Sequence, residues 1–190
     1  MSAEFGVTAW GRAWLRTVES TTVSAPNPAL PQARSLARNG AVHLATVGAG
    51  RVLAEVTVRG KVFPVTVQVP VWTRKDAGTV RRLLGRAGAQ DRRVSAGELP
   101  DGLVAELLAK DIAVAPVIAE CTATCGCTGR RSPCVHHLAV LYGLVRRVDE
   151  EPAVAVALRE NGARSTTVAA NPESDWLALT EIAADGFYGD

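Results

Sequence analysis

Hydrophobic and polar positions along the chain follow two different periods, which predict a mixture of helices and strands. Near the N-terminus, a helix is expected over residues 5–19, capped by Thr8. Large apolar residues recur there every four positions and would line one face of the helix: Trp10, Trp14 and Val18. We interpret the two tryptophans as core anchors rather than as base-stacking residues. The prolines of residues 24–31 predict a connecting loop.

Three runs then predict strands, at Ala41–Val47, Val52–Arg59 and Val62–Val69, and apolar and polar residues alternate well in the last two. Turn-forming residues separate them, at Gly48-Ala-Gly50 and at Gly60-Lys61. We therefore expect an antiparallel meander. Pro64 inside the third run predicts an edge position or a bulge, because proline has no backbone N–H to donate.

The rest of the chain is predicted to be mainly helical. Helices are expected at 76–90, 98–110, 135–148 and 151–160, with an apolar strand or extended run at 112–119. A further helical turn is expected near Trp176–Ile182. The predicted fold is therefore α+β: a small antiparallel meander with packed helices, and a hairpin and helix stabilised by a metal.

This order of elements suggests three parts. We expect an N-terminal α+β lobe over 1–110, a metal-binding module over 111–162 and an acidic C-terminal segment over 163–190. The chain has no apolar run of about 20 residues, and it does not begin with a secretion signal. We therefore expect a cytoplasmic protein with reduced thiols.

Charge is unevenly distributed along the chain, although the net charge is only +2. Residues 1–148 hold 19 Lys or Arg against 10 Asp or Glu, whereas residues 149–190 hold 2 against 9. Such asymmetry is typical of a basic binding face with an acidic tail, and it also arises when helix surfaces merely differ in sign. One basic stretch stands out: between Arg74 and Arg93 lie seven Lys or Arg and only two carboxylates. Such a stretch is typical of a surface that binds phosphates, and it is equally typical of a helix face exposed to solvent.

All four cysteines fall between Cys121 and Cys134, and two of the three histidines follow at once. The spacing Cys-x-Cys-x6-Cys-x-His offers three thiolates and one imidazole to a tetrahedral Zn²⁺ ion, one per chain, from Cys125, Cys127, Cys134 and His136. A complete set of protein ligands leaves no position for water, so we expect structural rather than catalytic zinc. Two residues compete for ligand roles. Cys121, which we expect to be a buried thiol, would replace one of the cysteines, and His137, which we expect beside the ligands or on the surface, would replace His136.

This cysteine and histidine spacing, with Pro133 before Cys134 and the helix from His136 to Tyr142 after it, resembles the SWIM zinc finger. The N-terminal Phe5-Gly-Val-Thr-Ala-Trp10 and the segment Gly97-Glu98-Leu99-Pro100 are similar to parts of bacterial proteins that contain this finger. The resemblance implies a zinc-stabilised module that binds DNA or other proteins, with a Swi/Snf-type helicase-like ATPase as an implied partner. His137, where an aliphatic residue is usual, and the additional Cys121 depart from the family pattern.

We therefore expect a non-enzymatic zinc protein that binds DNA or serves a DNA-processing assembly. Four arginines are candidate nucleic-acid contacts: Arg130, Arg131, Arg146 and Arg147. They would equally balance the charge of three thiolates on one zinc. The alternative is an adaptor that docks to the ATPase without touching nucleic acid, using the acidic tail with Trp176 and Phe187-Tyr188. An enzyme is the least favoured class, because the chain has no phosphate-binding glycine loop, paired carboxylates or nucleophile elbow.

Overall fold

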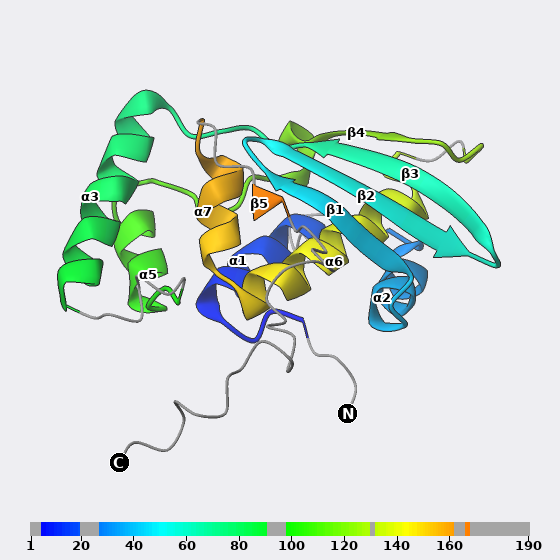
Figure 1. Cartoon of the computed structure of the whole chain (residues 1–190), viewed down its shortest axis with the longest axis horizontal. Helices are drawn as coiled ribbons and strands as arrows, with labels where there is room; N and C mark the ends of the chain where they lie inside the picture. Colours follow the sequence, from blue (N-terminus) through cyan, green and yellow to red (C-terminus); the bar gives the residue numbers. More distant parts are fainter. Residues whose placement is uncertain (1–4, 20–26, 91–97, 130–131, 162–165, 168–190) are drawn as a thin grey trace, which may run out of the picture.

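The fold is α+β and is built on one antiparallel sheet. The computed structural model describes residues 5–19, 27–90, 98–129, 132–161 and 166–167. The strands lie in the order β4-β3-β2-β1-β5, and the long helix α6, Val135–Glu150, packs on strands β1 to β4 (Figure 1). Helices α1 (Ala9–Val18) and α2 (Leu30–Arg38) also contact α6. Helix α6 is therefore the centre of the core.

The meander forms as predicted, from β1 (Val42–Gly48), β2 (Arg51–Val58) and β3 (Lys61–Gln68). Two-residue turns connect the strands, and all four turn residues have positive φ: 47° and 73° at Ala49-Gly50, and 50° and 76° at Arg59-Gly60. Turns of this kind match the right-handed twist of the paired strands. Gly50 and Gly60 therefore adopt backbone angles that glycine accepts without steric cost.

Strand β4, Thr122–Cys125, extends the meander by pairing with the second half of β3, from Val65 to Gln68. Residues 61–64 of β3 lie beyond this pairing, so β3 is an edge strand for half of its length. Pro64 lies where β4 ends, and its carbonyl accepts a hydrogen bond from the Gly126 N–H at 3.1 Å. Because the N and O of one strand residue point to the same side, the missing N–H of Pro64 faces away from β2 and no bond to that strand is lost. The segment 111–162, predicted as a module, thus shares one sheet with the N-terminal meander.

The central helix α6 confirms the predicted helix over 135–148. All residues from His136 to Val145 are buried, so the helix is enclosed by the sheet and by its neighbouring helices. A helix that is apolar on nearly every side belongs in the interior of a domain. The shorter α7, Ala153–Arg159, follows it and packs against β1 and α6, close to the predicted helix over 151–160.

The N-terminal helix confirms its predicted cap and buried face. The Thr8 hydroxyl accepts a hydrogen bond from the Gly11 N–H at 2.9 Å, and Trp10 and Trp14 are fully buried. Helix α2 was not predicted. The loop expected over 24–31 ends at Leu30, where α2 begins, and Pro31 occupies its first turn. Proline has the right backbone angle for that position and needs no hydrogen-bond partner there.

Helices α3 (Arg74–Gln90) and α5 (Gly102–Leu108) form one end of the molecule, and the turn between β2 and β3 lies at the opposite end (Figure 1). The apolar run at 112–119 is not a strand: it is irregular and leads into a short 3-10 helix, Ile118–Glu120. Buried side chains bind its carbonyls in place of a strand partner. Trp72 Nε1 donates to Ala113 O at 2.9 Å, and Thr17 Oγ1 donates to Pro116 O at 2.6 Å.

Of the predicted acidic segment 163–190, the structure describes only Thr166–Thr167, which form β5 beside β1. The helical turn expected near Trp176–Ile182 lies outside the described residues. Across the described helices, none combines the length and the apolar character needed to cross a membrane.

Candidate metal centre

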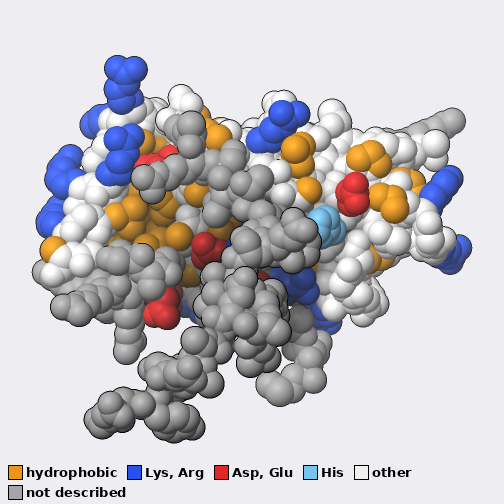
Figure 2. Space-filling model, viewed as in Figure 1, with side chains coloured by type: hydrophobic (Ala, Val, Ile, Leu, Met, Phe, Trp, Pro, Cys, Tyr) orange, Lys and Arg blue, Asp and Glu red, His pale blue; other side chains and the backbone are white. Residues whose placement is uncertain are grey.

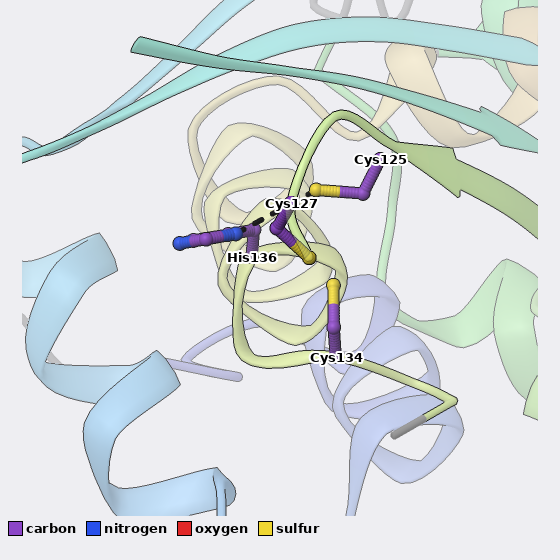
Figure 3. Close-up of side chains that lie close together, drawn as sticks. All are labelled: Cys125, Cys127, Cys134 and His136. Carbon is purple, nitrogen blue, oxygen red and sulfur yellow. Dashed lines mark hydrogen bonds between the residues drawn. The ribbon is translucent and has the colours of Figure 1, made fainter. Parts of the chain in front are cut away.

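The structure brings the four predicted ligands to one point between β4 and α6. The ligand atoms of Cys125, Cys127, Cys134 and His136 all lie within 4.8 Å of one another (Figure 3). Cys125 ends β4, Cys127 lies in the turn after it, Cys134 caps the N-terminus of α6 and His136 lies in the first turn of that helix. The four residues could therefore hold one metal ion.

The turn after β4 depends on a close approach to β3. A Cβ atom at Gly126 would lie 3.3 Å from Pro64 Cδ, a contact tighter than side chains ordinarily make. Glycine thus lets the strand end turn over Pro64 while both cysteines face the same point. The crowding that this glycine relieves comes from the Pro64 ring.

His136 is held in place by an aromatic stack. Its Nδ1 atom lies 3.6 Å from Cys125 Sγ, and its ring stacks on Phe63 of β3, with centroids 4.2 Å apart and an angle of 17° between the planes. Burial lowers the pKa of His136, which favours the neutral ring that a metal ion needs. Sequence reasoning missed Phe63. Its spacing contained the signal, because Phe63 is two residues before the buried Val65 and so shares its face.

Cys134 is the N-cap of α6, and its Sγ atom accepts a hydrogen bond from the His137 N–H at 3.4 Å. The first N–H groups of a helix have no partner within the helix, so this sulfur satisfies one of them, and the helix dipole places partial positive charge beside it. The fold therefore supplies both a donor and a favourable field to this sulfur. The same short segment caps the central helix and offers two metal ligands.

The metal-free thiols differ in acidity. Burial raises the pKa of Cys125 to about 12. Burial opposes ionisation of Cys127 as well, but hydrogen bonds from the Gly129 backbone and from the neighbouring thiols lower the pKa of Cys127 overall. A bound metal ion must therefore displace at least the proton of Cys125.

The two competing residues lie outside the cluster. Cys121 is half-buried rather than buried as expected; its Sγ atom contacts the Val117 carbonyl at 3.8 Å, and its partial burial raises the pKa of Cys121 to about 11. His137 is 6% exposed and its N–H bonds Cys134 Sγ, so of its two expected positions the one beside the ligands is correct and the surface position is wrong. Burial lowers its pKa to about 4, and its Nε2 atom has no hydrogen-bond partner among the described residues. His137 contributes its backbone N–H to the site, through Cys134.

Of the four candidate arginines, the structure describes Arg146 and Arg147. Arg130 and Arg131 lie outside the described residues. Arg146 and Arg147 lie about three turns along α6 from His136. Each faces a carboxylate one turn later: Arg147 Nη2 lies 2.5 Å from Glu151 Oε2, and Arg146 Nε lies 3.9 Å from Glu150 Oε1. These two side chains therefore lie near acidic partners and away from the metal cluster.

Comparisons with protein-family models, with curated proteins and with solved structures found no match for this chain. The chemistry of the cluster therefore rests on its own geometry. Three sulfur atoms and one ring nitrogen at mutual distances within 4.8 Å form a set compatible with zinc binding.

Proposed function

We propose that this chain is a non-enzymatic, SWIM-type zinc protein in which one Zn²⁺ ion fastens the edge of the sheet to the central helix. The observation that carries the proposal is the approach of Cys125, Cys127, Cys134 and His136 to within 4.8 Å. Thiolate and imidazole ligands select zinc over Mg²⁺ or Ca²⁺, which prefer oxygen. Four protein ligands complete a tetrahedron and leave no site for a catalytic water.

A structural role follows from the elements that supply the ligands. Cys125 and Cys127 come from the end of β4, a strand at the edge of the sheet, and Cys134 and His136 come from the start of the buried α6. Six residues separate Cys127 from Cys134 in the sequence, and we call this segment the return loop. The ion would hold both ends of this loop against the core.

For the wider role we propose that the zinc-stabilised fold binds nucleic acid. The charge of the chain supports this proposal: 19 Lys or Arg against 10 Asp or Glu in residues 1–148. Phosphate contacts from such residues release counterions, so binding would weaken steeply as salt rises.

The test is fluorescence anisotropy of labelled duplex and single-stranded DNA, titrated with the zinc-loaded full chain at several salt concentrations. We expect binding at low salt and a linear fall of log affinity with log salt. If neither DNA binds at low salt, the nucleic-acid proposal is wrong and the adaptor role toward a helicase-like ATPase takes its place.

A further inference from the structure

The most basic element of the described structure is α3, which lies far from the metal cluster in sequence. It carries five Lys or Arg among its 17 residues, whereas none of the other described helices carries more than two. Figure 2 shows Lys and Arg side chains gathered along this end of the molecule. We propose that the outward face of α3 binds the sugar–phosphate backbone of a nucleic acid, an inference that rests on the proposed function.

The helix separates an apolar face from a basic one. Ala77, Val80 and Leu83 are buried and attach α3 to the body. Lys75, Arg82 and Arg86 are exposed. At 100° per residue these three basic residues fall within about 40° of one another, on the side away from the buried residues. They form a single stripe, which we call the basic stripe.

The spacing of the basic stripe suits a phosphate backbone. Lys75 and Arg82 are separated by about 10 Å along the helix axis, and Arg82 and Arg86 by about 6 Å. Successive phosphates of one strand advance by about 3.4 Å along the duplex axis, so these intervals span about three and two phosphates. One strand could therefore meet all three side chains along the helix.

The charges of the basic stripe are not neutralised by ion pairs among the described residues. The pairs found there join other cations to carboxylates, as in Arg81 with Glu160 and Arg147 with Glu151. The single acid of α3, Asp76, accepts a hydrogen bond from the Thr73 hydroxyl at 2.7 Å, at the start of the helix. Arg146 and Arg147 differ in this respect, because each faces its own carboxylate.

The surface beside the basic stripe is bare backbone. A Cβ atom at Gly78 or Gly85 would meet no other atom within 4 Å. Glycine inside a helix costs about 1 kcal/mol relative to alanine, and packing does not require it at either position. Gly78 lies one turn before Arg82, and Gly85 lies about one turn after it. A phosphate backbone can thus approach α3 closely beside the arginine side chains.

The chemistry of this face favours nucleic acid over a membrane or an acidic protein. Its outward residues include Lys75, Gly78, Arg82, Gly85 and Arg86. The apolar residue that shares this face, Ala89, is too small to enter a lipid surface, and the face has no aromatic anchor for a protein interface. One guanidinium group can bind two oxygens of a phosphate at once, through two parallel N–H donors. Contacts to phosphate oxygens carry no sequence information, so we infer binding independent of sequence.

The test compares salt dependence in matched full-length, zinc-loaded variants on one labelled 20-base-pair duplex. The variant Lys75→Gln/Arg82→Gln/Arg86→Gln should weaken binding and lower the slope of log affinity against log salt by about 2 to 3, since each phosphate contact contributes about 0.9. The control Arg51→Gln/Arg59→Gln/Lys61→Gln removes the same charge from exposed positions of the strands and turns. It should lower the slope by less than about 1. The single variant Arg82→Gln, with a decrease of about 1, guards against misfolding of the triple variant.

Two outcomes overturn the inference, and they differ from failure of the proposed function. A stripe variant with the slope of the parent chain shows that DNA binds elsewhere. Equal decreases in the stripe variant and the control show a diffuse charge effect with no site on α3. Failure of the parent chain to bind at low salt refutes the nucleic-acid function itself.

Discussion

Phe63 of β3 lies flat against His136 of α6, so a strand of the meander supports a ligand of the metal cluster. Residue 63 lies on the half of β3 that β4 does not cover, next to the edge at Pro64. The stack thus joins the N-terminal meander to the metal cluster through two side chains that are 73 positions apart, from 136 − 63.

Replacing Phe63 with leucine should weaken zinc binding without removing it. The smaller side chain leaves His136 free to rotate away from Cys125, and residues that orient metal ligands commonly contribute tenfold or more to affinity. We expect a loss of about tenfold in competition with a chelator. The neighbouring Val62 is 52% exposed, so Val62→Ala is the control and should retain the parent affinity. Equal affinities of the two variants would show that the stack has no role at the site.

Gly11 and Asp149 are expected to determine how tightly α1 packs on α6. Asp149 accepts hydrogen bonds from the Gly6 and Thr8 N–H groups at 2.7 and 2.8 Å, and a Cβ atom at Gly11 would lie 1.9 Å from its Oδ1. Gly11→Ala should therefore displace the carboxylate and lower the free energy of unfolding by about 2 kcal/mol. Urea denaturation measures this change.

The matched control is Gly78→Ala, at a helix position where a Cβ atom meets nothing within 4 Å. It should raise the free energy of unfolding by about 0.5–1 kcal/mol, since alanine restricts the unfolded chain and favours helix. Two substitutions of the same type would then change stability in opposite directions. A stabilising Gly11→Ala would contradict the packing described.

The ligand assignment predicts different results for two cysteines that are six positions apart. Cys127→Ser should reduce the zinc content well below one per chain and unfold the return loop, because metal binding and local folding are coupled. Cys121→Ser should keep one zinc, since its Sγ atom contacts Val117 O outside the cluster. Elemental analysis of both proteins decides the point. Loss of zinc from Cys121→Ser would place that thiol among the ligands.

Zinc affinity should rise with pH. Burial raises the pKa of Cys125 to about 12, so this thiol is protonated at neutral pH without metal and must release its proton to bind. Acidification therefore opposes zinc, by about tenfold per pH unit for each proton released. Calorimetry in buffers of different ionisation enthalpy counts these protons. Binding without proton release would contradict a thiolate site.

Without metal, a rise in pH should have the opposite effect and lower the stability of the fold. A thiol whose pKa is raised on folding favours the folded state below its ordinary pKa of about 9, and this contribution is lost as pH increases toward about 12. Stability of the metal-free protein should fall over that window. Cys125→Ser should reduce the fall.

Local periodicity predicted much of this fold because the elements concerned are strongly patterned. The alternation of β2 and the four-residue period of Trp10, Trp14 and Val18 each left one plausible structure. The ligand set followed from spacing in the same way. Helix α2 was missed because it has only nine residues and prolines lie just before and at its start, a feature typical of loops.

The relationships that sequence could not show are tertiary. The addition of β4 to β3 depends on pairing between residues about 60 positions apart, such as Val65 and Cys125, which lie opposite one another. The ion pairing of Arg147 with Glu151 had a local signal in its four-residue spacing. For Phe63, the sequence indicated only the face of the strand on which its side chain lies. That its ring stacks on His136 became known only from the folded chain.

X-ray absorption at the zinc edge of the purified full chain would identify the ligand atoms of the metal directly. We expect one zinc per chain, with three sulfur atoms at about 2.3 Å and one nitrogen at about 2.0 Å. A folded protein without zinc, or a coordination shell rich in oxygen, would contradict this expectation.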